Sequence, residues 1–504
     1  MFWADIIAKN LKAKTSHLVN DAKTPSGKVH VGSLRGVLIH DFVHKSLLSI
    51  GTKSNYTYHF DDFDPMDGLP VYLDQEKYSK FMGFPLKDLP APEGEGSYAE
   101  YYASDFLKVF NSLGAHPEII WSSQLYTSGK LDKAIKIVLD NAEAIQKVYH
   151  EISGSEKKKG WLPFQPVCEN CGKIGTTTAT DWDGKEVQYS CEEDLVEWAK
   201  GCGHEGKISP FGGTGKMPYK VEWPAKWFSL GVTIEGEGKD HASKGGTRDV
   251  ANHIAREIFK IEPPEDIAYE HILLGGKKMS SSKGLGSSAA AVAELLPPEV
   301  LRFLFARVPF QRAIDFDPSQ SNTIPDLFDE FDRGQKAYFS KDNEDLAKTW
   351  EAAQIGEIKE EFNLRFNLIK ELVKNLKSEA DILKEAEKMQ GRALLKIDED
   401  AVKLRIKYVK IWLEKFGQEE ANEKVELNEK QKELLKVLAQ ELNEQMSEDE
   451  LQNFIYNKGK DLGLKPAETF QAVYQTLLGK NQGPKAGALV QSVGIDEVKK
   501  KLNQ

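Results

Sequence analysis

The distribution of apolar and polar residues predicts two strands and a helix near the start of the chain. Residues 54–60, SNYTYHF, alternate aromatic and polar side chains as a strand does, and residues 16–22, SHLVNDA, form a short strand-like stretch. Between them, from about His30 onward, apolar residues recur at near-helical spacing: Leu34, Val37, Leu38, Phe42 and Leu47. A strand, a helix and a second strand in this order predict a right-handed βαβ unit and a parallel sheet.

The pattern changes several times farther along the chain. Residues 85–100 are rich in Pro, Gly and acidic residues and are typical of a linker, and a polar, cysteine-bearing segment then runs to about residue 218. Strand-like apolar stretches resume at 227–236 and 267–276. Leu, Glu, Lys and Ala dominate after residue 326, with no strand-like run. These changes indicate a split α/β sheet with a large insertion, followed by an all-α domain.

Composition limits the classes of protein to consider. The chain has 504 residues, of which 40% are hydrophobic and 29% charged, as expected for two to four globular domains. No apolar run is long enough to span a bilayer, and the first 14 residues form an amphipathic pattern rather than a signal peptide. We therefore expect a cytoplasmic protein without a membrane partner. The net charge of −11 gives no overall basic footprint, and we expect no DNA partner, although local patches can still bind RNA.

The segment TPSGKVHVGSLRG, residues 24–36, joins the first predicted strand to the first predicted helix. Glycines at such a junction let the backbone approach a ligand, and the free N–H groups of the helix start favour an anion. His30 and Ser33 share one helix face, while Gly32 leaves room for adenine or ribose. The segment therefore predicts a nucleotide phosphate site formed by Pro25, Ser26, Gly27, His30, Gly32 and Ser33.

A second polar segment, KKMSSSKG at residues 277–284, is too hydrophilic for a protein core. We expect Lys278 and the hydroxyls of Ser280, Ser281 and Ser282, together with Met279, to close over a polyphosphate. A lysine in this position stabilises the charge that moves onto a leaving pyrophosphate.

The four cysteines of the chain, Cys168, Cys171, Cys191 and Cys202, all lie within one short segment. Cys168 and Cys171 have the two-residue spacing of a zinc ribbon, and a cytosolic disulfide pair is disfavoured. Cys191 and Cys202 complete a tetrahedral site, or His204 replaces one of them. Four protein ligands predict a structural Zn²⁺ with no part in catalysis.

The two polar segments together resemble the paired signatures of class I aminoacyl-tRNA synthetases, usually written His-Ile-Gly-His and Lys-Met-Ser-Lys-Ser. Here Ser33 and Ser281 replace one residue in each. The phrases FWADIIAKNL, LPFQPVCENCGK, VEWPAKW, EGKDHASKGGTRD and GKNQGPKAGALVQSVGI occur in the right order, and with the two signatures they resemble the class I lysyl-tRNA synthetase family over nearly the whole chain.

This resemblance implies a two-step reaction. Lysine attacks the α-phosphate of ATP, with Mg²⁺ on the phosphates, and the lysyl group then passes to the terminal adenosine of tRNA(Lys). His30 and Lys278 are the implied catalytic residues. The protein positions reactants and neutralises charge, so that no side-chain nucleophile is needed.

The resemblance also places the amino-acid pocket around Ala22, Thr24, Tyr219 and His241. Ala22 stands where relatives often have Gly, and Tyr219 where many have Trp. A lysine ammonium needs carboxylates and an aromatic wall. Asp61, Asp64, Glu237 and Asp240 can provide the carboxylates, and Tyr219 can provide the wall. Asp62 and Asp67 fit a solvated turn better, and Trp223 and Trp227 fit the core better than the pocket.

The fold that the resemblance implies is a Rossmann-type parallel-sheet catalytic domain split by a zinc-ribbon-containing insertion, then a stem-contact region and an all-α anticodon-binding domain. The expected segments are 1–90 and 219–290 for the two halves of the catalytic domain, 91–218 for the insertion, 291–325 for the stem-contact connection and 326–504 for the anticodon-binding domain.

Two other interpretations remain open. The same machinery can serve arginine, glutamate or cysteine, although abundant pocket acid disfavours glutamate and the position of the cysteines disfavours cysteine. A tRNA-binding or regulatory paralogue without catalysis is the second alternative, and the intact His30, Gly32 and Lys278 argue against it.

Overall fold

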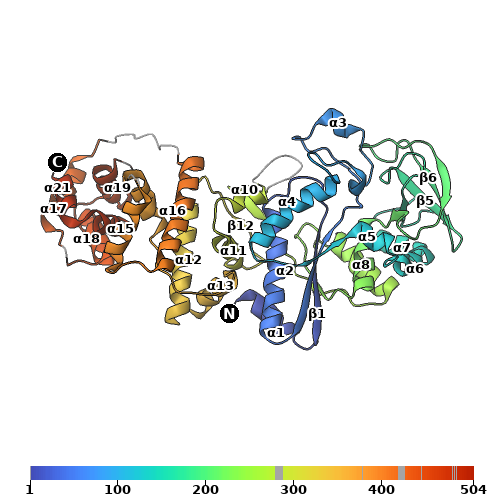
Figure 1. The fold of residues 1–504 in the computed structure, drawn as a ribbon, viewed down its shortest axis with the longest axis horizontal. Coiled ribbons are helices and arrows are strands. Elements are labelled where there is room, and N and C mark those ends of the chain that lie inside the picture. The colour runs from blue at the N-terminus through green and yellow to red at the C-terminus, as the bar shows by residue number, and fades with distance from the viewer. Residues whose placement is uncertain are drawn as a thin grey trace. The chain divides into compact units, whose positions relative to one another are not determined.

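The computed structural model divides the chain into two compact units, Met1–Glu360 and Glu361–Gln504, each considered by itself (Figure 1). The structure describes residues 2–278, 288–376, 378–417, 426–443, 445–479, 481, 483 and 485–503; the side chains of residues 277, 278 and 492 lie outside that description.

A four-stranded parallel sheet forms the centre of the first unit. Its strand order is β3-β2-β1-β9, where β1 is Ser16–Lys23, β2 is Lys53–Phe60, β3 is Glu118–Trp121 and β9 is Ile234–Glu235. Helix α2 (Gly32–Ser49) connects β1 to β2 and buries the apolar residues that the sequence pattern singled out, among them Leu34, Val37 and Phe42 (Figure 1). The predicted βαβ unit is confirmed.

The strand order creates a switch point beside β1. The chain moves from β1 to β2 on one side, whereas β9 pairs with β1 on the other side. Ligands of open parallel sheets bind beyond the carboxyl ends of the strands at such a switch point. The ends of β1 and β9, at Lys23 and Glu235, therefore mark the expected position of a site.

The segment 85–100 is part of the folded core and not a linker. Leu86 and Tyr98 are buried in one apolar cluster with Tyr78, which lies on α3 (Gln75–Ser79). Ser97 forms a capping box with Glu100 that starts α4 (Tyr98–Ser112). The Pro- and Gly-rich composition concealed apolar residues that lie too far apart to form a periodic pattern.

The chain between β3 and β9 forms the insertion. Its helices are α5 (Ser122–Thr127), α6 (Asp132–Asp140), α7 (Ala142–Ser153) and α8 (Tyr219–Leu230). Its strands β5 (Thr177–Trp182), β6 (Val187–Cys191) and β7 (Glu205–Ile208) form an antiparallel sheet, and β4 (Gln165–Pro166) pairs with β8 (Gly215–Lys216).

The two later strand-like stretches are mostly not strands. Helix α8 continues to Leu230 and ends at Gly231, which has a left-handed φ of 75°, so that only Ile234 and Glu235 of 227–236 form a strand. In 267–276 only β10 (Ile272–Leu274) is extended, in a small sheet with β11 (Lys277–Lys278) and β12 (Ile314–Asp315). The apolar run at 227–236 begins with the last residues of α8, among them the buried Trp227.

The first compact unit extends beyond residue 326, where the sequence pattern placed the start of the all-helical domain. Helices α12 (Thr323–Ser340) and α13 (Glu344–Ala353) pack on α11 (Pro298–Ala306), with the ring of Phe331 5.5 Å from that of Phe303. The guanidinium of Arg302 bonds Asp41 in α2 at 2.8 Å and the carbonyl of Ala352 at 3.0 Å. These contacts join α11 and α13 to the sheet domain. The first unit also contains α1 (Trp3–Leu11), α9 (Thr247–Ile254), the π-helical turn η2 (Ala255–Phe259), η1 (Leu86–Asp88) and α10 (Ala289–Ala293).

The second unit is all-helical over the residues that the structure describes. Its apolar core includes Leu434, Leu438, Leu451, Ile455 and Val473. Across both units, none of the described helices is long and apolar enough to cross a bilayer. The helices of the second unit are α14 (Phe366–Asn375), α15 (Glu379–Gln390), α16 (Lys396–Phe416), α17 (Glu429–Glu441), α18 (Glu448–Asp461), α19 (Pro466–Leu478), α20 (Ala486–Val493) and α21 (Ile495–Leu502).

Candidate active site

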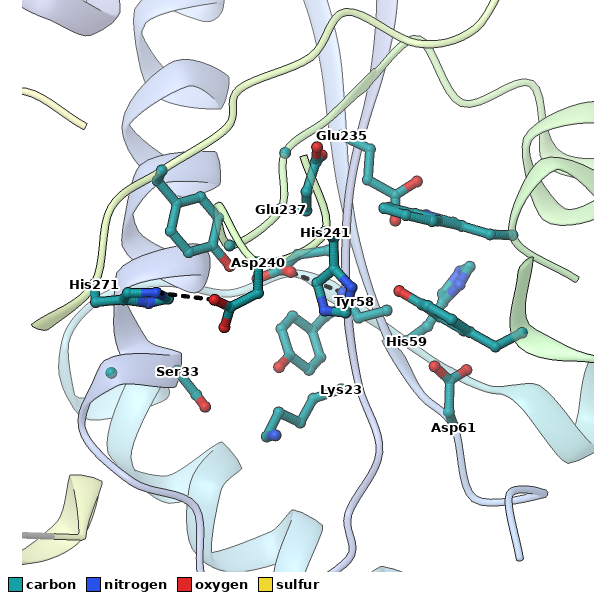
Figure 2. Close-up of a pocket in the computed structure, with 18 of the residues that line it drawn as sticks. Lys23, Ser33, Tyr58, His59, Asp61, Glu235, Glu237, Asp240, His241 and His271 are labelled. Carbon is teal, nitrogen blue, oxygen red and sulfur yellow. Dashed lines mark hydrogen bonds and ion pairs between the residues drawn. The ribbon is translucent and has the colours of Figure 1, made fainter. Parts of the chain in front are cut away.

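A cavity of about 230 Å³ lies at the switch point, beyond the carboxyl ends of β1 and β9 (Figure 2). Residues from β1, β2, α2, α8 and the segments around β9 and β10 line it. Carboxyl groups outnumber lysines in this lining, which contains Asp21, Asp61, Glu222, Glu235, Glu237, Asp240 and Glu270 but only Lys23 and Lys226. The cavity therefore suits a ligand that carries a cationic group.

The segment at residues 24–36, called the first motif from here on, forms one wall of this cavity. His30, Gly32 and Ser33 line it, whereas Pro25, Ser26 and Gly27 lie in the preceding turn, outside the lining. The Tyr98 hydroxyl donates to the carbonyl of Ser26 at 2.8 Å and fixes that turn. A Cβ at Gly27, where φ is +158°, would lie 2.5 Å from the hydroxyl of Tyr72.

Gly32 accommodates the imidazole of His30. A Cβ on Gly32 would lie 2.7 Å from Cε1 and from Nδ1 of His30, closer than side chains approach. The absence of a side chain at Gly32 therefore lets the ring lie against the start of α2, where the helix leaves N–H groups for an anion.

The second motif, KKMSSSKG at residues 277–284, lies mostly outside the described residues. Residues 277 and 278 form β11, but the side chain of Lys278 and all of Met279, Ser280, Ser281 and Ser282 are outside the described residues. The chain that follows returns to the first motif: Ser288 forms a β-bridge with His30, and the backbone N–H of Ala289 donates to the carbonyl of Val29 at 2.9 Å. The described chain just beyond the second motif, at Ser288 and Ala289, is thus next to the first motif.

Asp61 and Asp64 form ion pairs with lysines of the protein itself. Asp61 pairs with Lys226 and Asp64 pairs with Lys216, and all four side chains are buried or largely buried. Burial alone would raise the pKa of Asp61, but Lys226 and Lys216 outweigh burial and hold that pKa well below its usual range. The two carboxylates therefore already have counter-ions before any ligand enters.

Glu222 completes this buried network. Its carboxylate lies 3.0 Å from Nζ of Lys216 and 3.5 Å from Nζ of Lys226, and it is 1% exposed. Three carboxylates thus share two ammonium groups, and Asp61, Glu222 and Lys226 of this network line the cavity. Asp62 stands apart from the network: it accepts from the backbone N–H of Ser123 at 2.8 Å and caps α5, which is a structural role.

The remaining predicted lysine-binding residues divide into two groups. Ala22, Asp61, Tyr219, Asp240 and His241 line the cavity, whereas Thr24 and Asp64 do not. Instead, the Thr24 hydroxyl donates to Asp64 Oδ2 at 2.6 Å. The ring of Tyr219 stacks on Trp223 at 5.4 Å and lies 6.1 Å from His241. Trp223, which the sequence assigned to the core, is buried and also lines the cavity.

Several lining residues were not singled out from the sequence. His59 is fully buried at the end of β2, and neither ring nitrogen has a hydrogen-bond partner within the described residues. Burial, followed by the charge of Lys226, lowers the pKa of His59 to about 3, so that the ring is neutral. Glu237, which the sequence did offer as a pocket carboxylate, also lines the cavity. Burial raises the pKa of Glu237 to about 8, although Arg248 lies 3.1 Å away. The alternating pattern of 54–60 was the one available signal for His59.

Asp240 faces a histidine across the mouth of the cavity. Its Oδ1 lies 3.2 Å from Nε2 of His271, as the dashed line in Figure 2 shows. Asp240 and His241 come from the loop after β9, and His271 precedes β10. The mouth is therefore built from the half of the chain that follows the insertion.

The four cysteines form one cluster in the insertion. Sγ atoms of Cys168, Cys171, Cys191 and Cys202 all lie within 4.8 Å of one another. Cys191 ends β6, and Cys202 lies just before β7. Four converging sulfur donors fit a tetrahedral metal such as zinc. His204 is not a member of this group, although its carbonyl accepts from the backbone N–H of Cys191 at 2.8 Å.

Comparison with known proteins extends this description over the whole chain. Residues 1–358 match the family model described as tRNA synthetases class I (K), and residues 343–504 match the model described as anticodon binding domain. The chain therefore belongs to the class I tRNA synthetase family. The predicted fold class and the resemblance on which it depended are confirmed, with the helical C-terminal unit as the anticodon-binding domain.

The curated proteins most similar in sequence include several lysine–tRNA ligases. A lysine–tRNA ligase of Thermoplasma volcanium is 36% identical over 507 residues, which cover 98% of this chain and 97% of that protein. Lysine–tRNA ligases of Thermoplasma acidophilum and Archaeoglobus fulgidus are each 34% identical, with 100% of this chain covered and 98% and 99% of theirs.

Proposed function

We propose that this protein ligates lysine to tRNA(Lys). Lysine and ATP form lysyl-adenylate and pyrophosphate, and the 3′-terminal adenosine of the tRNA then takes the lysyl group. The observation that carries this proposal is the full-length similarity to lysine–tRNA ligases, combined with an acidic cavity at the switch point of the sheet. We place the reaction in the cytoplasm, where ATP and tRNA are supplied.

The nucleotide lies against the first motif. His30, Gly32 and Ser33 line the cavity at the start of α2, and we assign them, with Pro25, Ser26 and Gly27 of the preceding turn, to ATP. Lys278 and the serines after it take the β- and γ-phosphates, on which Mg²⁺ is carried. Because charge moves onto the pyrophosphate as its bond breaks, His30 and Lys278 lower the barrier by facing that charge.

The lysine substrate occupies the side of the cavity lined by Ala22, Asp61, Tyr219 and His241. The stacked rings of Tyr219 and Trp223 form a wall for the aliphatic stem. Neutral His59 offers a ring nitrogen that can accept a hydrogen bond from the ammonium. Asp61 and Asp64 are already paired with Lys226 and Lys216. They therefore contribute to the electrostatic potential of the pocket rather than serving as the sole counter-ions of the substrate ammonium.

An exchange assay tests the amino-acid assignment directly. The purified protein is expected to exchange labelled pyrophosphate into ATP with lysine and not with arginine, glutamate or cysteine. The assay is run with and without tRNA(Lys), because some class I synthetases activate their amino acid only with tRNA bound. Exchange with a different amino acid and not with lysine would change the proposed substrate to that amino acid. No exchange with any of the twenty amino acids, with or without tRNA, would favour the paralogue without catalysis.

The cysteine cluster holds a structural Zn²⁺. The four thiolates of Cys168, Cys171, Cys191 and Cys202 are the ligands, and they leave no open position for a substrate. The metal thus joins β6 to the loops on both sides of the small antiparallel sheet and takes no part in the chemistry.

A pair of lysines that flank the ring of Tyr149, Lys157 and Lys220, is suited to the phosphate backbone of the tRNA. Nζ of Lys157 lies 4.7 Å from the ring centre of Tyr149, and Nζ of Lys220 lies 5.9 Å from the same ring. Burial, followed by the charge of Lys220, lowers the pKa of Lys157. A bound phosphate would reduce the repulsion between the two ammonium groups. Lys220 is also next in sequence to the cavity residue Tyr219.

Reversing both charges is expected to weaken tRNA use selectively. Lys157→Glu with Lys220→Glu should raise the KM for tRNA in aminoacylation by roughly tenfold and reduce its salt dependence, while lysine-dependent exchange stays as in the wild type. The control is Lys136→Glu with Lys147→Glu, two helix-surface lysines of the same insertion that already face carboxylates. Equal effects of the two double variants would contradict a specific contact.

A further inference from the structure

Lys23 occupies a position in the cavity to which no role has been assigned. It is the last residue of β1, in register with Phe60 of β2, and its side chain lines the cavity. Side chains of a strand alternate between faces, so that Lys23 shares a face with Asp21 and not with Ala22. The direction of Lys23 can therefore be established from Asp21.

Asp21 faces α2. Its carboxylate lies 3.7 Å from Nδ1 of His40, and a Cβ on Gly36 would lie 2.9 Å from its Oδ2. Both Gly36 and His40 are residues of α2. One step farther along the strand, Lys23 thus extends toward the start of α2. In Figure 2 its amine points to the side of the cavity that carries Ser33, away from Asp61.

The amine of Lys23 differs from the other lysine amine of the cavity. Lys226 is held by Asp61 and Glu222, whereas Lys23 forms no ion pair within the described residues. Burial lowers the pKa of Lys23, against the fields of Asp21 and Asp61, and burial raises the pKa of Asp21 to about 7. Because Asp21 is then partly protonated at neutral pH, it only partly balances the positive charge of Lys23. An anion bound in the cavity would stabilise its ammonium form.

We propose that Lys23 binds the anionic centre at which the amino-acid carboxylate meets the α-phosphate of ATP. This inference rests on the proposed function. All three of Lys23, Ser33 and Asp61 line the cavity, and Lys23 lies between Ser33, on the nucleotide side, and Asp61, on the amino-acid side (Figure 2). Two anions must approach each other there, and a cation between them reduces their repulsion.

The step balances without any further reactant. A carboxylate oxygen of lysine forms a bond to the α-phosphorus, and the bond from that phosphorus to the bridging oxygen breaks. The electron pair leaves with pyrophosphate, and no proton is transferred. Lys23 contributes charge alone, and it is a catalytic residue in the sense that it touches the reacting groups.

The test compares Lys23→Met with Lys23→Arg and with a control at the other end of the same sheet. Lys23→Met is expected to lower kcat for lysine-dependent exchange by about a hundredfold, and Lys23→Arg to retain a larger share of the activity. Lys53→Met replaces the exposed first residue of β2, far along the strand from the cavity, and should match the wild type.

Calorimetric binding separates the two anions and excludes a merely structural role. If Lys23 contacts the carboxylate, Lys23→Met weakens lysine binding but not the binding of lysinol, in which an alcohol replaces the carboxylate. If Lys23 contacts the phosphate, the same change weakens ATP but not adenosine. Either difference supports the proposal.

Two outcomes would overturn the inference. One is exchange by Lys23→Met within about twofold of the wild type, since a lost charge contact costs far more. The other is an equal loss of affinity for lysine, lysinol, ATP and adenosine, which would indicate that the substitution damages the whole pocket. Exchange by the wild type is measured first, so that its failure would count against the proposed function and not against Lys23.

Discussion

Alanine at His30 or at Lys278 is expected to slow lysine-dependent pyrophosphate exchange by roughly two to three orders of magnitude, because each removes a group that faces the charge developing on the phosphates. The double variant should lose much less than the product of the two single effects, since both groups act on the same triphosphate. The measurement is kcat for exchange at saturating lysine and ATP.

The structure supplies a matched control for the histidine. His116 is exposed, and its ring bonds Asn111 at 3.3 Å. His116→Ala should leave exchange unchanged. If Lys278→Ala exchanged pyrophosphate at a near-normal rate, the segment after β11 would have another role. Fully multiplicative effects in the double variant would mean that the two residues act on separate steps.

Serine at Cys168 is expected to remove the metal. The wild type should carry about one zinc per chain, and Cys168→Ser should lose it and melt at a lower temperature, because metal binding to a structural site contributes directly to folding stability. The KM for lysine should change little until the temperature approaches the lowered Tm. Zinc content by atomic emission and thermal melting monitored by circular dichroism provide the measurements.

The variants His204→Ala and Cys202→Ser decide which residue is the fourth ligand. Since Cys202 lies with the other three sulfur atoms and His204 does not, His204→Ala should keep its zinc and Cys202→Ser should lose it. Retention of one zinc per chain by Cys168→Ser would contradict the ligand set.

The parts of the fold that could be predicted from sequence are those with local signals. The parallel pairing of β1 with β2 follows from a strand-like stretch, a helical pattern and an alternating segment in that order. The turn before α2 follows from Gly27, His30 and Gly32. The knuckle spacing of Cys168 and Cys171 likewise indicated the cysteine cluster. Each of these signals lies within a few neighbouring residues.

The parts that could not be predicted depend on distant partners. Asp61 and Asp64 look like ligands for a substrate ammonium until Lys216 and Lys226, more than a hundred residues later, pair with them. Trp223 is both buried and part of the cavity, a combination that helical periodicity cannot reveal.

Lys23 and His59 were overlooked for a related reason. Lys23 lies between the predicted pocket residues Ala22 and Thr24, and His59 is the second-last residue of β2, but neither had a sequence signal of its own. Their positions in the cavity appear once β1 and β2 lie side by side with α2 and α8 around them. The alternation within β1 was sufficient to place Lys23 and Asp21 on one face. The sequence contained no indication of which ligand that face would meet.

The buried ion pairs around Glu222 have a consequence for shortening this enzyme. Lys216 belongs to the insertion, whereas its partner Asp64 belongs to the first half of the sheet. A catalytic fragment trimmed of residues 122–218 would keep β3 but leave Asp64 without its cation. Loss of one partner of a fully buried pair costs about 3–5 kcal/mol, an upper figure for Asp64, whose side chain is 21% exposed. A minimal engineered version therefore needs a new cation or an uncharged residue at position 64.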